Sequence, residues 1–303
     1  MRKPNELFLY LGVILLIAAG QTLGISALPA VPDDREPGMG YREEQDRAQE
    51  PLPWEGDPHF VAAVTENGAR VLMARYSAVF PGPTPGELYN VGLSAQRLAG
   101  TVVRAGEVFS QNSLLGPYTG EKGYQEGPIF KGNQVVNSTG GGVCKVASLL
   151  YNVAVLCNFT VLERHNHSMT VPYVPPGQDA TVFYGSKDFC FRNDSSGPVV
   201  IWAETVDNTL HIAAYGQEKP PEVTWRHEVV KQVDYWTVYR TNPDLAPGTE
   251  EVIIPGQKGC QVRSTALVKG KDGRVEEKDL GESWYNVQPQ VIERGPEPNP
   301  GTG

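Results

Sequence analysis

The chain has 303 residues, of which 40% are hydrophobic and 20% charged, and this balance excludes a wholly disordered protein. Its 33 glycines and 25 prolines argue against a helical bundle and favour short strands joined by turns. The net charge is −9 and the sequence has no basic stripe. This excludes nucleic-acid binding, because phosphate neutralisation needs clustered Lys and Arg.

The N-terminus contains an apolar run, from residue 7 to residue 30, that follows Arg2 and Lys3. At ~1.5 Å per helical residue, such a run can cross a ~30 Å hydrocarbon core. Its basic flank indicates the cytoplasmic side, so the rest of the chain is expected outside the cell. Residues 1–30 therefore predict a signal anchor that ties the protein to the cell membrane, or a signal peptide whose cleavage would release a secreted protein.

Composition divides the rest of the chain into further segments. Residues 31–60, rich in Pro, Gly and charged side chains, predict a disordered linker, and residues 295–303 predict a disordered tail. Residues 61–217 mix strand-like runs with helical stretches, whereas residues 218–294 hold short alternating runs separated by Pro-Gly and Asp-Gly turns. We expect an α+β fold with antiparallel pairing, in which a mixed domain precedes a small all-β module.

A glycine turn, a cysteine and a helix follow one another in the middle of the chain. Gly141 and Gly142 belong to a glycine triplet suited to a tight turn, and an apolar stripe predicts a helix over residues 145–157. Cys144 falls where the turn enters the helix, and the amides and dipole at a helix start favour a thiolate there. The same amides are candidate donors to an oxyanion. The alternative is that Cys144 is a buried packing residue.

The cysteines leave two interpretations open. An even number of cysteines in an exported segment suggests disulfides, but the spacing of Cys144, Cys157, Cys190 and Cys260 matches no disulfide framework. Reduced cysteines with separate roles are the second interpretation. No CxxC pair and no Cys/His pair at zinc-finger spacing occurs, so no structural zinc site is predicted.

A second candidate cluster follows a strand-like run. If the strand continues, Glu163, His165 and His167 share one face, and Arg164 lies on the other. The imidazoles then offer a general base for the cysteine, and the carboxylate of Glu163 or of Asp179 offers a group to orient it. The two imidazoles and Glu163 also match a metal site, an interpretation that we rank below catalysis.

Three sequence blocks resemble the VanW family, which is named for an accessory protein of vancomycin-resistance clusters in Gram-positive bacteria. The blocks are GEVFSQNSLLGPYTGEKGYQEGP, TGGGVCKVASLLYNVAVL and VLERHNHSMTVPYVPPGQDATV, and the likeness extends over residues 70–216. Residues 223–294 are similar to a G-five domain, a small strand-rich module of bacterial surface proteins. The resemblance implies an exported protein of the cell envelope.

The resemblance also implies a reaction. Some VanW domains are implicated as L,D-transpeptidases, which form 3-3 cross-links between peptidoglycan stem peptides through a cysteine nucleophile. Carried over by position, the family's cysteine is Cys144 and its histidines are His165 and His167. These are the expected nucleophile and proton-transfer groups, with Asp179 to orient them and without a cofactor. The expected substrate-binding residues are Gly141, Gly142, Lys145 and Arg164.

Three positions depart from the family pattern, among them Ala147 where the family usually has Ser, and they keep a second function open. Lys145 stands where the family usually has Gln, and Tyr118 stands where it usually has Arg. If that Arg binds a substrate carboxylate, its absence weakens the enzymatic interpretation. The alternative is a non-catalytic protein that binds the cell wall or assists glycopeptide resistance, with the G-five segment supplying adhesion.

Overall fold

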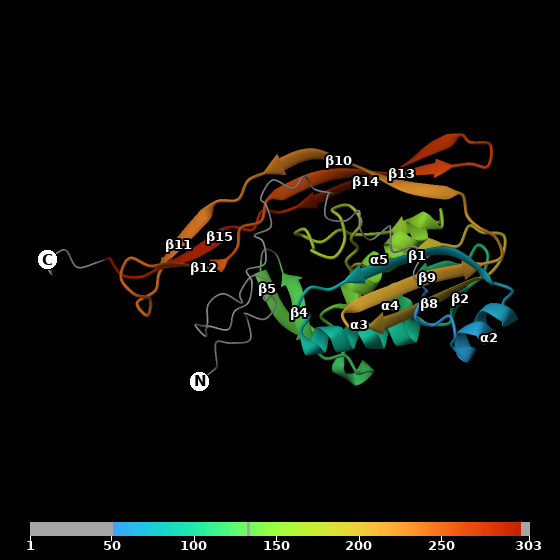
Figure 1. The fold of residues 1–303 in the computed structure, drawn as a ribbon, viewed down its shortest axis with the longest axis horizontal. Helices are drawn as coiled ribbons and strands as arrows, with labels where there is room; N and C mark the ends of the chain where they lie inside the picture. The colour runs from blue at the N-terminus through green and yellow to red at the C-terminus, as the bar shows by residue number, and fades with distance from the viewer. Residues whose placement is uncertain (1–50, 132–133, 298–303) are drawn as a thin grey trace.

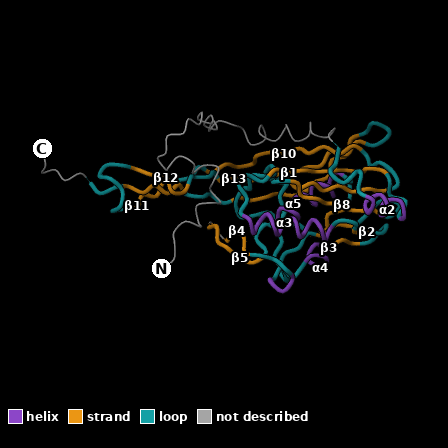
Figure 2. Tube along the Cα trace, turned by 60° about the horizontal axis from the view of Figure 1, so that its bottom comes forward, coloured by secondary structure: helices purple, strands orange, loops and turns teal. Residues whose placement is uncertain are grey.

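The computed structural model describes residues 51–131 and 134–297. The predicted signal anchor at residues 1–30 lies outside the described residues, as does most of the predicted linker. Among the described residues, the helices precede residue 157 and the C-terminal part consists of strands and loops (Figure 2). A mixed unit followed by an all-β unit is therefore confirmed. Within these ranges, no helix combines the length and the apolar character needed to cross a bilayer.

A four-stranded antiparallel sheet forms the centre of the N-terminal unit (Figure 1). Neighbouring residues on a strand point to opposite faces, and here both faces are buried. Ile201 packs in the main core on one face, and Trp202 packs in a second cluster on the other. Such a sheet needs a cover on each side. Its strands, in spatial order, are β1 (Val71–Val79), β9 (Thr209–Gly216), β8 (Val199–Val206) and β2 (Thr101–Val103).

Two helices cover the face that carries the main core. Helix α5 (Val143–Leu156) is buried around most of its circumference and packs on β1 and β9, as expected of a central helix. Helix α3 (Pro85–Leu98) packs on β8 and begins with a capping box, in which the side chains of Thr84 and Glu87 each accept from the other's backbone amide. The helix predicted over residues 145–157 is therefore confirmed, with its start at Val143.

The opposite face is covered by a segment that was expected to be a disordered linker. Leu52 and Trp54 are 3% and 1% exposed and pack in the second cluster, and the Trp54 indole donates to the Tyr215 hydroxyl at 2.9 Å. Helix α2 (Pro58–Glu66) follows and packs on β8. The linker prediction is wrong for residues 51–60, because Leu52, Trp54 and Phe60 suffice to anchor a polar segment to an apolar sheet face.

Short elements complete the N-terminal unit. They are β3 (Val108–Ser110), α4 (Gln111–Leu115), the 3₁₀ turn η3 (Gly120–Lys122), β4 (Glu126–Lys131), β5 (Gln134–Thr139), β6 (Thr160–Glu163) and β7 (Cys190–Arg192). Strands β3, β7 and β6 form a small antiparallel sheet, and β4 and β5 form a hairpin. The second strand of this hairpin leads directly into the glycine turn before α5.

The C-terminal unit is a long ribbon of strands that lies along the N-terminal unit and extends beyond it (Figure 1). Its strands are β10 (Glu222–Val233), β11 (Thr237–Thr241), β12 (Glu250–Ile254), β13 (Gly259–Lys269), β14 (Val275–Tyr285) and β15 (Gln290–Arg294). The sheet β10–β13–β14 lies over α5, and the sheet β11–β15–β12 lies farther out. The expected antiparallel pairing holds for the named strands except between β11 and β15, which are parallel.

The two units share one hydrophobic core. Val223, Ala266 and Val268, from β10 and β13, are buried in the same cluster as α5. The Trp225 ring meets the Tyr151 ring of α5 edge-on, with the ring centroids 5.6 Å apart. The C-terminal unit is therefore built into the core of the N-terminal one.

Candidate functional site

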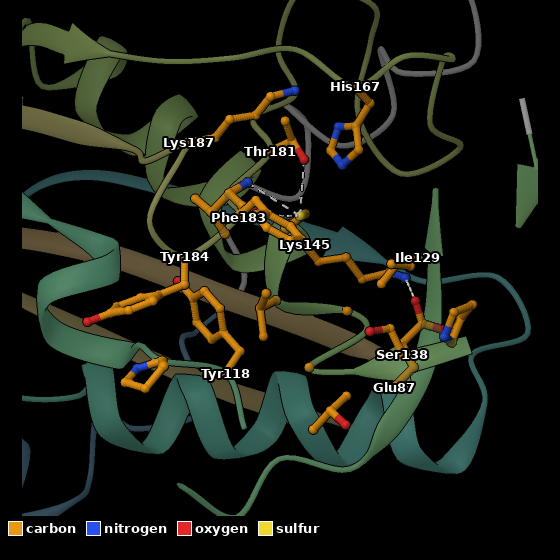
Figure 3. Close-up of a pocket in the computed structure, with 18 of the residues that line it drawn as sticks. Glu87, Tyr118, Ile129, Ser138, Lys145, His167, Thr181, Phe183, Tyr184 and Lys187 are labelled. Carbon is orange, nitrogen blue, oxygen red and sulfur yellow. Dashed lines mark hydrogen bonds and ion pairs between the residues drawn. The ribbon is translucent and has the colours of Figure 1, made fainter. Parts of the chain in front are cut away.

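The first turn of α5 opens onto a cavity of about 670 Å³ (Figure 3). Gly142 caps the helix with a φ of 103°, a left-handed conformation that favours glycine. A β-carbon at this position would also come within 2.9 Å of the Glu87 side chain. Through this tight turn, Cys144 reaches the second position of the helix, half-buried at the cavity wall.

The sulfur of Cys144 has partners from a neighbouring loop. The Thr181 hydroxyl lies 3.3 Å from it and the Val182 amide nitrogen 3.5 Å, and the His167 imidazole forms a hydrogen bond with it. Burial raises the pKa of Cys144, but the hydrogen bond and charge of His167, helped by Thr181 and Val182, outweigh burial. The pKa of this thiol therefore lies below the ordinary value, which favours a nucleophilic thiolate.

His167 is buried between the sulfur and Asp179. Its Nδ1 lies 2.7 Å from Asp179 Oδ2, and its backbone N–H donates to the same oxygen at 2.6 Å. Because Nδ1 is engaged, Nε2 is the ring nitrogen that remains for Cys144. Burial lowers the pKa of His167, but the hydrogen bonds and charges of Asp179 and Cys144 raise it to about 9. At neutral pH the imidazole is therefore protonated.

Asp179 is 1% exposed and accepts from donors on several elements. Arg164 donates from Nη2 to Oδ1 at 3.0 Å and from Nε to the backbone oxygen at 2.7 Å, and the Tyr285 hydroxyl of β14 also donates to Oδ1. Burial raises the pKa of Asp179, but the hydrogen bonds and charge of His167, with the charge of Arg164, hold it below its usual value. The group is a carboxylate that orients the imidazole and balances its charge.

The strand alternation predicted after Glu163 is wrong. Strand β6 ends at Glu163, and the chain then turns because Asp179 binds both Arg164 and His167. Two side chains expected on opposite faces therefore meet on one carboxylate. His165 does not join them: its Nε2 lies 3.0 Å from a Glu163 carboxylate oxygen, and its side chain is 40% exposed.

The alternative metal site has no structural support. Glu163 pairs with His165, whereas His167 is committed to Asp179 and the sulfur. In the part of the chain that the structure describes, no three His, Cys, Asp or Glu side chains gather in a way that could hold a metal ion.

The two predicted substrate-binding cations are committed to buried ion pairs. Lys145 lines the cavity but pairs with Glu87 of α3, and the two side chains are 6% and 1% exposed (Figure 3). Arg164 pairs with Asp179, donates to Ser283 Oγ at 2.7 Å and does not line the cavity. Binding a substrate carboxylate would leave a buried carboxylate unpaired, which is costly. We therefore assign Lys145 and Arg164 a structural role, in which their ion pairs hold the residues of the site in place.

The two predicted substrate-binding glycines occupy different positions. Gly142 lines the cavity, whereas Gly141 packs against Gly127 of β4 and does not line it. A β-carbon on Gly141 would come within 2.2 Å of the Gly127 backbone, so the close approach of the hairpin to the turn requires glycine.

Side chains that the sequence analysis did not assign to the site form much of the cavity wall. Tyr118, Tyr184 and Thr181 line the cavity together with Cys144 (Figure 3). Phe183 and Tyr184 are 64% and 51% exposed at the rim, and Lys187 from the same loop also lines the cavity. The cavity therefore combines aromatic area with a positive charge.

Thr181 and Tyr285 contact the candidate site, but the sequence could have indicated only one of them. Thr181 stands two residues after Asp179 in the same block, so its proximity to the site could have been inferred. Nothing local marks Tyr285, which is 106 residues away from Asp179.

All four cysteines are free thiols, so the disulfide interpretation is wrong. Burial raises the pKa of Cys157 above the ordinary range. Mainly through burial, the pKa of Cys190 is raised to about 12 and that of Cys260 to about 11. Cys144 differs from the other three in the direction of its shift.

Comparison with protein families identifies both parts of the chain. Residues 86–215 match the family described as VanW like protein, and residues 225–297 match the G5 domain. The chain carries a VanW-family domain followed by a G5 domain. The resemblances seen in the sequence blocks are therefore confirmed. Cys144, His167 and Asp179 lie in the VanW domain, whereas Tyr285 belongs to the G5 domain.

Two curated proteins are similar to this chain. The uncharacterized protein YoaR of Bacillus subtilis (strain 168) is 34% identical over 146 residues, which cover 48% of each protein. The vancomycin B-type resistance protein VanW of Enterococcus faecalis (strain ATCC 700802 / V583) is 27% identical over 145 residues, which cover 46% of this chain and 52% of that protein. The chain thus spans about half the length of these relatives. Its VanW and G5 domains are consistent with a protein associated with the cell wall.

Solved G5 structures also resemble part of the chain. The IgA1 protease G5 domain is 26% identical, and the match covers 27% of this chain and 100% of that structure's chain, with a TM-score of 0.18. HP0197-G5 is 22% identical, and the match covers 24% of this chain and 99% of that structure's chain, with a TM-score of 0.15.

Proposed function

We propose that this chain is an exported cell-envelope protein whose VanW domain acts on peptidoglycan stem peptides as a cysteine-dependent acyltransferase of the L,D-transpeptidase type. The observation that carries the proposal is the contact series from Cys144 through His167 to Asp179 at a cavity wall. Acyl transfer by a thiol requires a nucleophile of lowered pKa, a base beside it and a group that orients the base. Because peptidoglycan lies outside the cytoplasm, the proposal includes an extracellular site.

In the first half-reaction, the Cys144 thiolate attacks the carbonyl carbon of the amide that precedes the terminal D-Ala of a tetrapeptide stem. A C–S bond forms and the carbonyl oxygen becomes an oxyanion. When the C–N bond breaks, His167, protonated at the start, gives its proton to the departing amine. The products are a thioester on Cys144 and free D-Ala.

In the second half-reaction, an amine from a neighbouring stem attacks the thioester. The neutral His167 takes a proton from that amine, the C–S bond breaks, and the thiolate returns with the imidazolium beside it. Asp179 stays ionised throughout and balances the charge of the imidazolium. One amide is exchanged for another, so the reaction balances without an added reactant.

The first turn of α5 supplies the donor to the oxyanion. The amides of Val143 and Lys145 already donate within the turn, to the oxygens of Gly140 and Gly142 at 3.3 and 2.9 Å. We therefore assign the oxyanion to the amide of Cys144 itself, which lies between them.

The cavity wall suits a peptide that ends in a free carboxylate. Tyr118 and Tyr184 offer apolar area to the stem peptide. Lys187 is exposed at the cavity and offers a positive charge to the terminal carboxylate. It takes the role expected of Lys145 and Arg164, which are held in ion pairs.

The decisive experiment incubates the full-length protein with a disaccharide-tetrapeptide. Mass spectrometry then measures a thioester on Cys144 and 3-3 cross-linked dimers. We expect both products with the wild-type protein and neither with Cys144→Ala. Cys190→Ala is the matched control, because it removes another half-buried free thiol, of raised pKa, and should retain both products.

The competing function is a non-catalytic wall-binding or resistance-accessory protein. Trp236 and Trp284 favour it, because these large side chains are 58% and 51% exposed on the G5 domain. Cosedimentation with peptidoglycan sacculi measures such binding directly. Wild-type protein that sediments with sacculi but forms neither the thioester nor a cross-link would contradict the acyltransferase proposal.

A further inference from the structure

We infer that the G5 domain positions the acid–base residues of the VanW domain through Tyr285 of β14. The inference deepens the proposed function and rests on it. Tyr285 is a positioning residue: its hydroxyl contacts Asp179, which orients His167, and it lies outside the cavity lining. The reactive site is therefore composed from both domains.

The two carboxylate oxygens of Asp179 have separate partners. Oδ2 accepts from the ring and the backbone amide of His167. Oδ1 accepts from the Tyr285 hydroxyl and from Nη2 of Arg164. Rotation of the carboxylate would break both sets of bonds, so the donors on Oδ1 fix the plane in which Oδ2 meets the imidazole.

Strand β14 contributes one donor to Oδ1, Tyr285, and binds the other, Arg164, through Ser283. Along it, Ser283 and Tyr285 are each 1% exposed, whereas Trp284 between them is 51% exposed. This alternation turns Ser283 and Tyr285 to the VanW domain. Ser283 accepts from Nη1 of Arg164 at 2.7 Å, so β14 acts on Asp179 directly through Tyr285 and indirectly through Arg164.

The Tyr285 hydroxyl is itself oriented. It accepts the amide hydrogen of Gly177 at 2.6 Å, which directs its own proton to Asp179. Burial raises the pKa of Tyr285, so the hydroxyl remains a donor. Gly177 has a φ of +95°, and a β-carbon there would come within 2.2 Å of Ser264 Oγ on β13, so the loop before Asp179 lies directly against the G5 sheet.

The test measures alkylation of Cys144 by iodoacetamide against pH in the full-length protein, by mass spectrometry of the Cys144 peptide. Tyr285→Phe keeps the ring and removes the hydrogen bonds of the hydroxyl to Asp179 and to Gly177. Because the released carboxylate can turn away from His167, the imidazolium loses support and the thiolate forms at higher pH. We expect the midpoint to rise by about one pH unit, which makes alkylation about tenfold slower at a pH below both midpoints.

Lys278→Met is the matched control. Lys278 is also on β14, and its Nζ donates to Asn158 Oδ1 at 2.7 Å across the same domain interface. We expect this variant to keep the wild-type midpoint. Ser283→Ala, which releases Nη1 of Arg164, should raise the midpoint by less than Tyr285→Phe does. Urea unfolding establishes that each variant is folded.

A folded Tyr285→Phe variant with the wild-type midpoint overturns the inference. An equal rise in Lys278→Met also overturns it, because a loosened interface would then explain both. If Tyr285→Phe does not fold, Ser283→Ala decides, and a wild-type midpoint there overturns the positioning role. An ordinary thiol midpoint in the wild-type protein contradicts the proposed function itself, so the two failures are distinguishable.

Discussion

Cys144 and Cys157 stand at opposite ends of α5, and their thiols differ in character. Burial raises the pKa of Cys157, which is 3% exposed and packs in the main core. At Cys144 the effect of burial is outweighed by His167, a side chain from a loop. Reactivity at the residue scale is therefore decided by one imidazole and the carboxylate behind it.

His167→Asn removes that imidazole and leaves burial dominant. We expect the pKa of Cys144 to rise above the ~8.5 of an ordinary thiol, and its alkylation at neutral pH to slow by about tenfold or more. The measurement is the pH profile of iodoacetamide labelling. His165→Asn is the control, because His165 pairs with Glu163, and it should keep the wild-type profile. A profile changed by His165→Asn and not by His167→Asn would reverse the assignment.

The candidate nucleophile is predictable from local sequence, whereas its candidate base is predictable only as one of two residues. Cys144 follows from a glycine triplet and an apolar stripe, which are local features. The choice between His165 and His167 depends on Asp179, which the fold brings to His167. The donor Tyr285 lies in another domain, beyond the reach of residue spacing.

A buried ion pair joins α3 to α5 at the element scale. Lys145 of α5 pairs with Glu87 of α3, and its amine lies 4.9 and 5.3 Å from the ring centroids of Phe80 and Tyr173. Glu87 also completes the capping box with Thr84. The Glu87 carboxylate therefore caps the start of α3 and forms an ion pair with the first turn of α5.

Glu87→Gln should destabilise the protein by about 3–5 kcal/mol, because it leaves the Lys145 charge buried without its partner. Glutamine still supports a capping box, so the loss reports the missing charge. Urea unfolding measures it. Glu87→Gln combined with Lys145→Gln should recover much of the stability, whereas Glu277→Gln in the exposed pair with Arg226 should change it little. A double variant no more stable than Glu87→Gln would contradict this account.

Element ends were less predictable than the elements themselves. The apolar stripe of α5 was clear, but β6 was expected to continue past Glu163, because strand alternation gives no warning of a distant carboxylate. Leu52 and Trp54 were likewise hidden in a polar segment, since composition averages over the few side chains that anchor it.

The whole molecule has two domains in sequence, and the main hydrophobic core is shared between them. Val223 and Val268 of the G5 domain are buried with α5, whereas Val291, 6% exposed, lies in the outer sheet β11–β15–β12. We therefore expect the VanW domain and the sheet β10–β13–β14 to unfold as one cooperative unit.

Matched valine truncations test this unit. Val268→Ala should cost on the order of 2 kcal/mol and accelerate hydrogen exchange of the α5 amides at least about tenfold. Val291→Ala removes the same atoms from the outer sheet and should leave α5 exchange unchanged. Native-state hydrogen exchange measures both. Unchanged α5 exchange in folded Val268→Ala would mean that the two domains unfold independently.

The tight contact at Gly177 has a consequence for how such proteins diversify. A side chain at this position would collide with Ser264 and His227 on the facing domain. A G5 domain from another protein could replace this one only if its surface left the same space opposite Gly177. It would also need a tyrosine at the position equivalent to Tyr285. The VanW and G5 domains of this chain are therefore fitted to each other, and a recombination event that replaces one domain must also supply the residues that make this contact.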